Sequence, residues 1–198
     1  MLNRFREKIT PITTRIGNIF GSLGLSPTFW SMIGFAFAIL STVFFGLNFL
    51  NQQGWEFPWQ VIASIMLLIS GFFDIVDGSV ARVMKKTTTR GAFLDSNFDK
   101  VSEASIFIGI AIGGLSNPIL AMIALSTSIL VSYLRARAES LGIELKGIGI
   151  GERAERLLIL AICGFIPISG SIQWGVLIII LISAISFIQR FMYVLKRI

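Results

Sequence analysis

Long apolar runs alternate with short polar segments along the chain, and four of these runs are long enough to cross a membrane. The hydrocarbon core of a bilayer is about 30 Å thick, so a spanning helix needs about 20 mostly apolar residues. The four runs cover residues 29–50, 58–76, 117–134 and 171–188, and their only charged residue is Asp74. The pattern predicts an all-α integral membrane protein.

Two further apolar runs, residues 104–115 and 157–167, are too short to span alone. An α-helix rises about 1.5 Å per residue, so each run spans only if its helix extends toward the N-terminus. The extensions would pass through residues 93–103 and 151–156, which carry charged side chains. With these extensions the sequence predicts six transmembrane helices.

The N-terminal segment, residues 1–25, has a different pattern. Phe5, Ile9, Ile12, Ile16 and Ile19 recur at helical spacing with basic residues between them. This spacing predicts an interfacial amphipathic helix that precedes the first span. The alternative is a frayed, positively charged tail. The chain shows no repeat or linker, so we expect one domain over residues 1–198.

The composition narrows the possible chemistry. Hydrophobic residues make up 54% of the chain and charged residues 14%, and the chain has no His and one Cys. A zinc site, a Cys–His dyad and a Ser–His–Asp triad are therefore excluded. Any reaction must use carboxylates, hydroxyls, Lys and Arg.

The basic residues predict the orientation in the membrane. All 17 Lys and Arg fall within residues 4–15, 82–100, 135–156 and 190–197. The connections on the opposite side, residues 51–56, 113–117 and 167–173, contain none. By the positive-inside rule, both termini are cytoplasmic in a multi-pass protein of the cell membrane.

Four aspartates, Asp74, Asp77, Asp95 and Asp99, are unusual so close to the apolar runs. Residues three or four apart share one helix face, and the second and third predicted spans meet at the cytoplasmic side. Carboxylates that converge repel each other, and a divalent cation with oxygen ligands removes that cost. The alternative is a set of ordinary interfacial ion pairs with nearby basic residues, namely Arg82, Arg90 and Lys100.

Small and basic residues accompany the aspartates. Gly78 and Ala81 let a bulky group approach the backbone, and Arg82 offers a fork of donors for phosphate oxygens. Gly91 opens the helix that carries Asp95 and Asp99, where backbone amides favour an anion. Metal ligands, small residues and an arginine together indicate a diphosphate site.

The spacing Asp74-x-x-Asp77-Gly78-x-x-Ala81-Arg82, followed by Gly91-x-x-x-Asp95-x-x-x-Asp99, resembles the signature of the CDP-alcohol phosphotransferase family. The resemblance implies that the four aspartates hold two Mg²⁺ or Mn²⁺ ions and that Asp99 is also the general base. It implies a nucleotide site formed by Asp74, Asp77, Gly78, Ala81, Arg82 and Gly91. One departure is Thr28, where the family often has Asn after a Ser/Thr-Pro pair.

A second group of residues bears on the acceptor. Arg135, Arg153 and Arg190 come from three predicted helices and suit a separate phosphate group, although the general excess of positive charge, with Glu partners, also explains them. The segments 132–139 and 151–156 resemble the subgroup that makes phosphatidylinositol phosphate or archaetidylinositol phosphate. That resemblance implies that inositol 1-phosphate is held by Ser132, Arg135, Arg153 and Arg190.

The predicted function is transfer of a lipid phosphate from a CDP-lipid to inositol 1-phosphate, with release of CMP in phospholipid biosynthesis. The apolar spans are equally compatible with diacylglycerol and archaeol tails. One alternative is the same reaction with glycerol 3-phosphate. A more distant one is a divalent-cation transporter, whose ionisable residues should lie near the bilayer midplane on broken helices. The expected partners are the two substrates, membrane lipids and a second copy of the chain, with no nucleic acid.

Overall fold

The computed structural model describes residues 2–85, 88–145, 147–166 and 168–198, and every regular element in these ranges is helical. The prediction of an all-α fold is confirmed for them. Two terminal residues of predicted segments lie outside the described residues: Met1, which begins the segment 1–25, and Pro167, which ends the run 157–167. The elements are α1 (Leu2–Gly21), α2 (Pro27–Leu47), the 3₁₀ turn η1 (Asn48–Gln53), α3 (Trp59–Val83), α4 (Thr89–Ile112), α5 (Pro118–Ser140), α6 (Arg153–Phe165) and α7 (Ser171–Leu195).

Side-chain caps start the helices that lead into the site. The Ser26 hydroxyl accepts a hydrogen bond from the Phe29 amide at 3.2 Å, and Pro27 occupies the first turn of α2. Thr88 caps α4 by accepting from the Gly91 amide at 3.0 Å. The first amides of a helix have no partner within the helix, so such caps determine where it begins. The cap at Thr88 starts α4 two turns before Asp95.

Within the described residues, four helices are long and apolar enough to cross a membrane: α2 with η1, α3, α5 and α7. Helix α4 has 24 residues, but its first half is charged. Helix α6 has 13 residues, which corresponds to about 20 Å. Its predicted extension from Gly151 is cut short because Gly151 has φ +74° and Glu152 forms a capping box with Glu155. The count of six spans stays a prediction.

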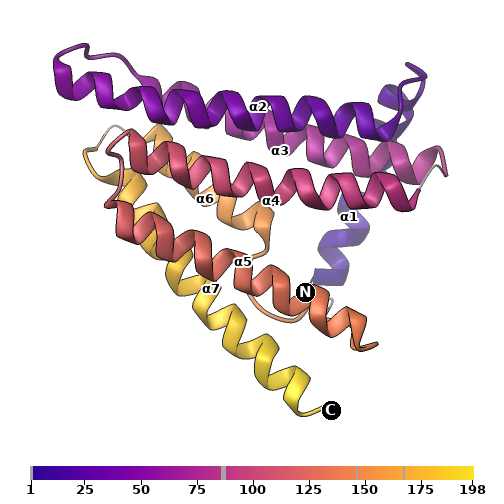
Figure 1. The fold of residues 1–198 in the computed structure, drawn as a ribbon. Helices are drawn as coiled ribbons and strands as arrows, with labels where there is room; N and C mark the ends of the chain where they lie inside the picture. The colour runs from indigo at the N-terminus through magenta and orange to yellow at the C-terminus, as the bar shows by residue number, and fades with distance from the viewer. Residues whose placement is uncertain (1, 86–87, 146, 167) are drawn as a thin grey trace.

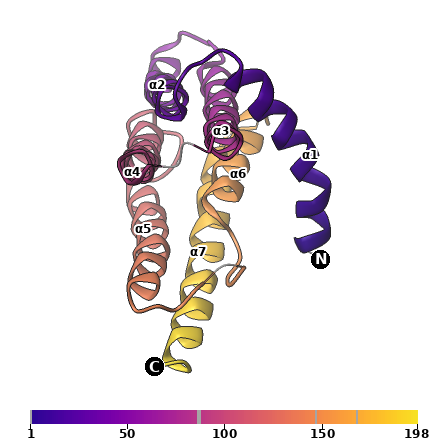
Figure 2. The same cartoon turned by 90° about the vertical axis from the view of Figure 1, so that its right-hand side faces the viewer.

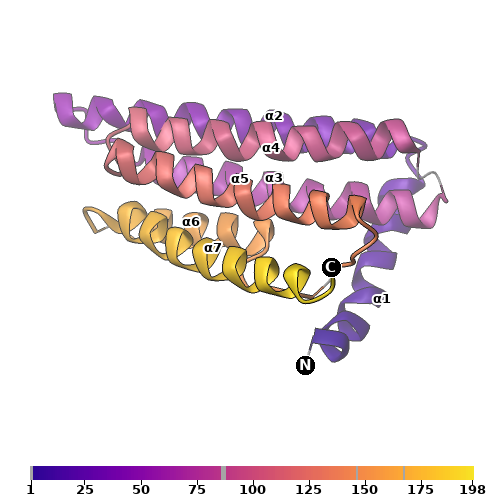
Figure 3. The same ribbon diagram turned by 60° about the horizontal axis from the view of Figure 1, so that its bottom comes forward.

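The helices form a bundle in which α2 packs against both α3 and α4, and α5 packs against α7 (Figures 1 and 2). Helix α6 lies between α3 and α7, and α1 contacts α3. Figure 3 shows both termini toward the end of the bundle where α3 passes into α4. The ends of α5 and α7 and the start of α6 face the same side, so residues far apart in sequence meet there.

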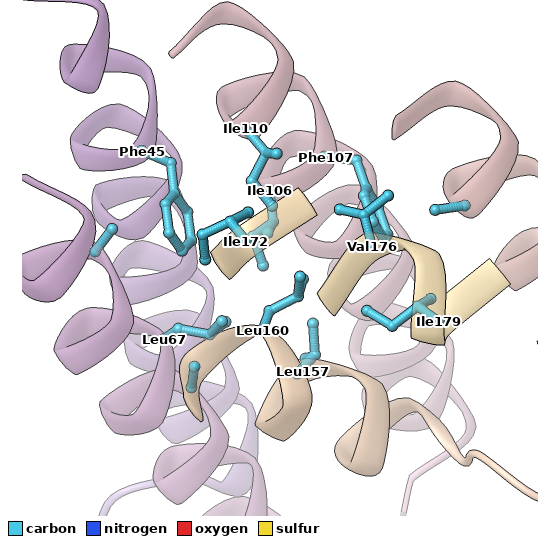
Figure 4. Packing of buried hydrophobic residues seen from close by; sticks show 13 residues of the cluster. Phe45, Leu67, Ile106, Phe107, Ile110, Leu157, Leu160, Ile172, Val176 and Ile179 are labelled. Carbon is cyan, nitrogen blue, oxygen red and sulfur yellow. The ribbon is translucent and has the colours of Figure 1, made fainter. Parts of the chain in front are cut away.

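An apolar core at the other end of the bundle holds the helices in register. Phe45, Leu67, Phe107, Leu160 and Val176 are buried in one cluster that joins α2, α3, α4, α6 and α7 (Figure 4). Helices α2 and α4 approach closely, since a Cβ at Gly109 would collide with the carbonyl oxygen of Thr42. This crossing fixes which face of α4 turns toward α3.

Candidate active site

Three of the predicted aspartates converge between α3 and α4. One carboxylate oxygen from each of Asp74, Asp95 and Asp99 lies within 4.8 Å of the others. Asp74 comes from the last third of α3, and the other two lie one turn apart on α4. The helix faces expected from the spacing therefore turn toward each other.

Asp77 lies beside this group and has a partner of its own. Its Oδ2 accepts a hydrogen bond from the Ser31 hydroxyl of α2 at 2.6 Å, and the residue is only 6% exposed. Asp77 nevertheless lines the same small cavity as the three converging aspartates, a space of about 10 Å³. That volume corresponds to roughly one water molecule. All four aspartates thus border one small polar space.

Arg153, at the start of α6, neutralises part of this charge. Its Nη1 lies 2.6 Å from Asp99 Oδ1 and 3.2 Å from Asp74 Oδ1. A set of carboxylate oxygens matches the preference of Mg²⁺ and Mn²⁺ for oxygen ligands, so these residues fit a divalent cation. The guanidinium contacts two of the three carboxylates that a cation would use.

On one side of the aspartates lies a cavity of about 190 Å³ between α2, α3 and the start of α4. A Cβ at Gly78 would meet only the flexible end of Arg82, at 3.6 Å, so the backbone there is open to the cavity. Arg82 is exposed and donates to the Ser79 hydroxyl at 3.1 Å, outside the lining. The lining comprises Pro27, Thr28, Ser31, Asp77, Gly78, Ala81, Thr88, Gly91, Ala92 and Asp95.

The structure thus brings four of the six residues predicted for the nucleotide to one cavity. Asp77, Gly78, Ala81 and Gly91 line it, whereas Asp74 lines the neighbouring cavities. Thr28, the departure from the family pattern, also borders this space.

On the other side lies a larger cavity of about 530 Å³ between α4, α5, α6 and α7. All four residues predicted for the acceptor phosphate, Ser132, Arg135, Arg153 and Arg190, line it. Asp74, Asp95 and Asp99 form its acidic wall. The carboxylate group therefore lies between the two cavities and borders both.

The predicted basic residues differ in how they are held. Arg190 is 4% exposed, and its Nε and Nη1 donate to the carbonyl oxygens of Ile148 and Val131 at 2.9 and 3.3 Å. Arg135 is half exposed and pairs with Glu139 at 2.9 Å. Arg190 is therefore fixed by the backbone, while Arg135 forms the Glu ion pair that the alternative interpretation expects.

Sequence reasoning gave no binding or catalytic role to three polar residues at the site, although it named Lys100 as a possible ion-pair partner of the aspartates. Ser31 contacts Asp77, Lys100 lines the larger cavity, and Glu103 is buried one turn beyond Lys100. A signal existed for the last two, since a charged pair inside the predicted third span needs a partner. Ser31 gave no such signal, because a serine in an apolar helix is common.

The chain is similar to known proteins over almost its whole length. Residues 25–193 match the family model described as CDP-alcohol phosphatidyltransferase. Archaetidylinositol phosphate synthase of Pyrococcus horikoshii is 38% identical over 197 residues, covering 100% of this chain and 98% of that protein. Phosphatidylinositol phosphate synthase of Streptomyces avermitilis is 36% identical over 173 residues, covering 83% of this chain and 67% of that protein.

Solved structures agree with this relationship. Phosphatidylinositol phosphate synthase of Mycobacterium tuberculosis with CDP-DAG bound superimposes with a TM-score of 0.76 at 26% identity, covering 93% of this chain and 94% of that one. The same enzyme in complex with manganese and citrate gives a TM-score of 0.75 at 26% identity, covering 92% and 88%. The family match spans well over half of the residues, and this membrane protein belongs to the CDP-alcohol phosphatidyltransferase family.

Proposed function

We propose that the protein transfers the phosphatidyl-type group of a CDP-lipid to inositol 1-phosphate and releases CMP. One observation carries the proposal: a group of converging carboxylates lies between a small cavity lined by the signature residues and a larger cavity lined by arginines. A donor and an acceptor can therefore approach the same carboxylates from opposite sides. The names of the similar proteins agree with both substrates.

The smaller cavity suits the CDP end of the donor. Gly78 and Ala81 leave the α3 backbone accessible, and Gly91 lies at the N-terminus of α4, where amides favour phosphate oxygens. Asp74, Asp77, Asp95 and Asp99 would hold two Mg²⁺ or Mn²⁺ ions, which stabilise charge on the attacking and leaving oxygens. Arg82 would reach the nucleotide only after leaving Ser79.

Asp99 would act as the general base. It borders both the small polar cavity and the larger basic cavity, so its carboxylate faces the place where an acceptor hydroxyl would arrive. The hydroxyl oxygen forms a bond to the β-phosphorus, the bond from that phosphorus to the CMP oxygen breaks, and Asp99 takes the hydroxyl proton. No histidine is needed for this step.

The larger cavity suits the phosphate of the acceptor. Arg190 is held by two backbone carbonyl oxygens, and Arg153 lines the same cavity, so a phosphate meets guanidinium donors there. Ser132 would donate to the phosphate only after its hydroxyl leaves the Ser128 carbonyl oxygen. Arg135 would contribute after exchanging Glu139 for the phosphate. Glycerol 3-phosphate also carries a phosphate and is the second candidate acceptor.

We also propose one domain with six transmembrane helices, formed by α2 to α7, and α1 as an interfacial helix. The interfacial position of α1 is supported by Ile12 and Ile19, which are exposed. On another face of α1, Gly17 packs so closely on α3 that a Cβ would meet the Ser79 carbonyl oxygen at 2.7 Å.

The distribution of Lys and Arg supports cytoplasmic termini and a cytoplasmic site. The family resemblance further implies a homodimer, which cross-linking in native membranes tests.

The reaction is tested by CMP release from purified protein with Mg²⁺ and a CDP-lipid. Inositol 1-phosphate, glycerol 3-phosphate, inositol and serine are offered separately, and we expect release with inositol 1-phosphate alone. Donors with diacylglycerol and archaeol tails are compared in parallel. Release only with glycerol 3-phosphate would discard the inositol assignment and keep the carboxylate argument. No release from folded, metal-bound protein would contradict the transferase and favour the transporter alternative.

A second test addresses the position of Arg153 between the carboxylates and the acceptor cavity. We expect Arg153→Met to bind Mn²⁺ several-fold more tightly, because a positive charge is removed from Asp74 and Asp99. The same change should raise the KM for the acceptor by roughly tenfold or more, the range for a lost charge-assisted hydrogen bond. Free Mn²⁺ is measured by electron paramagnetic resonance.

The control for this test is Arg137→Met, which removes an exposed arginine near the C-terminal end of α5. It should change neither the Mn²⁺ affinity nor the KM for the acceptor. Weaker Mn²⁺ binding by Arg153→Met would show that the arginine supports the cation rather than competes with it.

A further inference from the structure

A buried ion pair borders the larger cavity through Arg156. Glu103 of α4 and Arg156 of α6 have side chains that are 1% and 2% exposed. Arg156 donates from Nε and Nη2 to Glu103 Oε1 at 3.0 and 2.7 Å, and from Nη1 to the Gly151 carbonyl oxygen at 2.8 Å. The pair therefore joins α4, α6 and the turn that precedes α6.

Lys100 reaches the other oxygen of the same carboxylate. Its Nζ lies 3.4 Å from Glu103 Oε2 and donates to the Ser132 hydroxyl of α5 at 2.8 Å. The Ser132 hydroxyl in turn donates to the Ser128 carbonyl oxygen at 3.1 Å. Unlike the buried pair, the Lys100 side chain is 36% exposed, and it also lines the larger cavity.

Lys100, Glu103 and Arg156 together carry more positive than negative charge. Two cations, Lys100 and Arg156, share the single carboxylate of Glu103. Arg156 also lines the cavity, but its side chain is 2% exposed and makes a two-point contact with that carboxylate. The surplus positive charge is therefore exposed to the cavity at Lys100, whose side chain is 36% exposed. An ammonium group has three donors, and two of them have partners among the described residues.

The Lys100 ammonium contacts a different helix from the one that Asp99 contacts. Successive residues on a helix are turned by about 100° about its axis, so Asp99 and Lys100 face different neighbouring helices. Asp99 contacts Arg153 of α6, whereas the Lys100 ammonium reaches Ser132 of α5. The surplus charge thus faces the part of the cavity that Ser132 and Arg190 line.

We propose that Lys100 binds the phosphate of the acceptor directly, and that the buried Glu103–Arg156 pair positions its ammonium group. The inference rests on the proposed function and deepens it, since it adds a residue to the acceptor site and gives the ion pair a role. A phosphate that arrives beside Ser132 meets an ammonium held in place from behind. Lys100 would then be a binding residue, and Glu103 and Arg156 positioning residues.

The test compares Lys100→Met with the wild-type protein. Met is an unbranched side chain only one atom shorter than Lys, and it carries no charge. We expect the KM for inositol 1-phosphate to rise by roughly tenfold to a hundredfold, while kcat and the KM for the CDP-lipid change by less than about twofold. Inorganic phosphate, used as a competitive inhibitor, should lose affinity by the same factor. Lys100→Arg should recover most of the loss.

The role of Glu103 is tested by Glu103→Gln, alone and combined with Lys100→Met. If the carboxylate positions the ammonium, the single change raises the KM for the acceptor, and the double variant is little worse than Lys100→Met. Independent, multiplying effects of the two changes would overturn the positioning role. Lys196→Met, at the exposed end of α7, is the control and should leave the KM for the acceptor unchanged.

A readout without turnover separates this inference from the proposed function. Inorganic phosphate should raise the thermal unfolding temperature of the wild-type protein, and Lys100→Met should lose that shift even if no acceptor supports CMP release. Activity of the wild-type protein with glycerol 3-phosphate alone would overturn the assignment of inositol 1-phosphate as the acceptor. In that case the KM for glycerol 3-phosphate, compared between the wild type and Lys100→Met, tests the role of Lys100. An unchanged acceptor KM and an unchanged phosphate shift in Lys100→Met would overturn the inference alone.

Discussion

Replacing Asp99 by Asn is expected to reduce CMP release by about 10²- to 10⁴-fold, the usual contribution of a general base. The amide has nearly the same shape as the carboxylate but cannot take the proton of the acceptor hydroxyl. Asp99 borders the larger cavity, whereas the cavity assigned to CDP lies on the far side of Asp95. Binding of the CDP-lipid should therefore persist, and a direct binding assay in detergent measures it beside the rate.

The control for this prediction is Asn97→Ala, which changes an exposed residue on the same helix. It should leave both the rate and CDP-lipid binding unchanged. Mn²⁺ binding is measured on each variant, because Asp99 is also a proposed metal ligand. A nearly normal rate in Asp99→Asn would remove the residue from the base role. A lost rate accompanied by lost Mn²⁺ binding would assign it to the metal alone.

Breaking the buried ion pair is expected to have the largest effect on stability. Arg156→Met leaves the Glu103 carboxylate enclosed without its two-point partner. Removing one member of a buried pair costs about 3–5 kcal/mol of unfolding free energy. We expect the lower end of that range, because Lys100 Nζ still lies 3.4 Å from the carboxylate. Thermal unfolding in detergent measures the loss.

The double variant Arg156→Met/Glu103→Leu tests the physical reason. If the cost comes from the unpaired charge, replacing both partners by apolar side chains should restore most of the lost stability. Acceptor binding should stay weak in the double variant, since Lys100 has lost its anchor. A double variant as unstable as Arg156→Met would show that the guanidinium stabilises α6 through the Gly151 carbonyl instead.

The Asp99→Asn and Arg156→Met variants test different parts of the site. Asp99 is the proposed base at the reacting atoms, whereas Glu103 lies one turn further along α4 and is buried. One helix thus carries the proposed base and the group that organises the acceptor side. A shift or rotation of α4 would disturb both, which gives a physical reason for its close approach to α2 at Gly109.

The sequence was sufficient to predict the helices and the residues that approach each other along one helix. Apolar runs and the spacing of the aspartates are local signals, so they predicted α2, α3, α5 and α7 and the paired carboxylates. The family signature predicted four residues that line the smaller cavity, namely Asp77, Gly78, Ala81 and Gly91, whereas Asp74 and Arg82 lie outside its lining. The end of α6 nearest the site was predicted less well, because the turn at Gly151 depends on a positive φ that the sequence pattern did not reveal.

The partners that these residues find across helices became known only from the packed fold. It placed Asp77 on Ser31, Arg153 on Asp99 and Asp74, and Lys100 on Ser132. Periodicity gives the face of a helix, but the rotation of that face toward its neighbours follows from the packing of buried side chains and from close crossings. Contacts between residues separated by tens of positions depend on that rotation, so the site could be named from the sequence but assembled only in the fold.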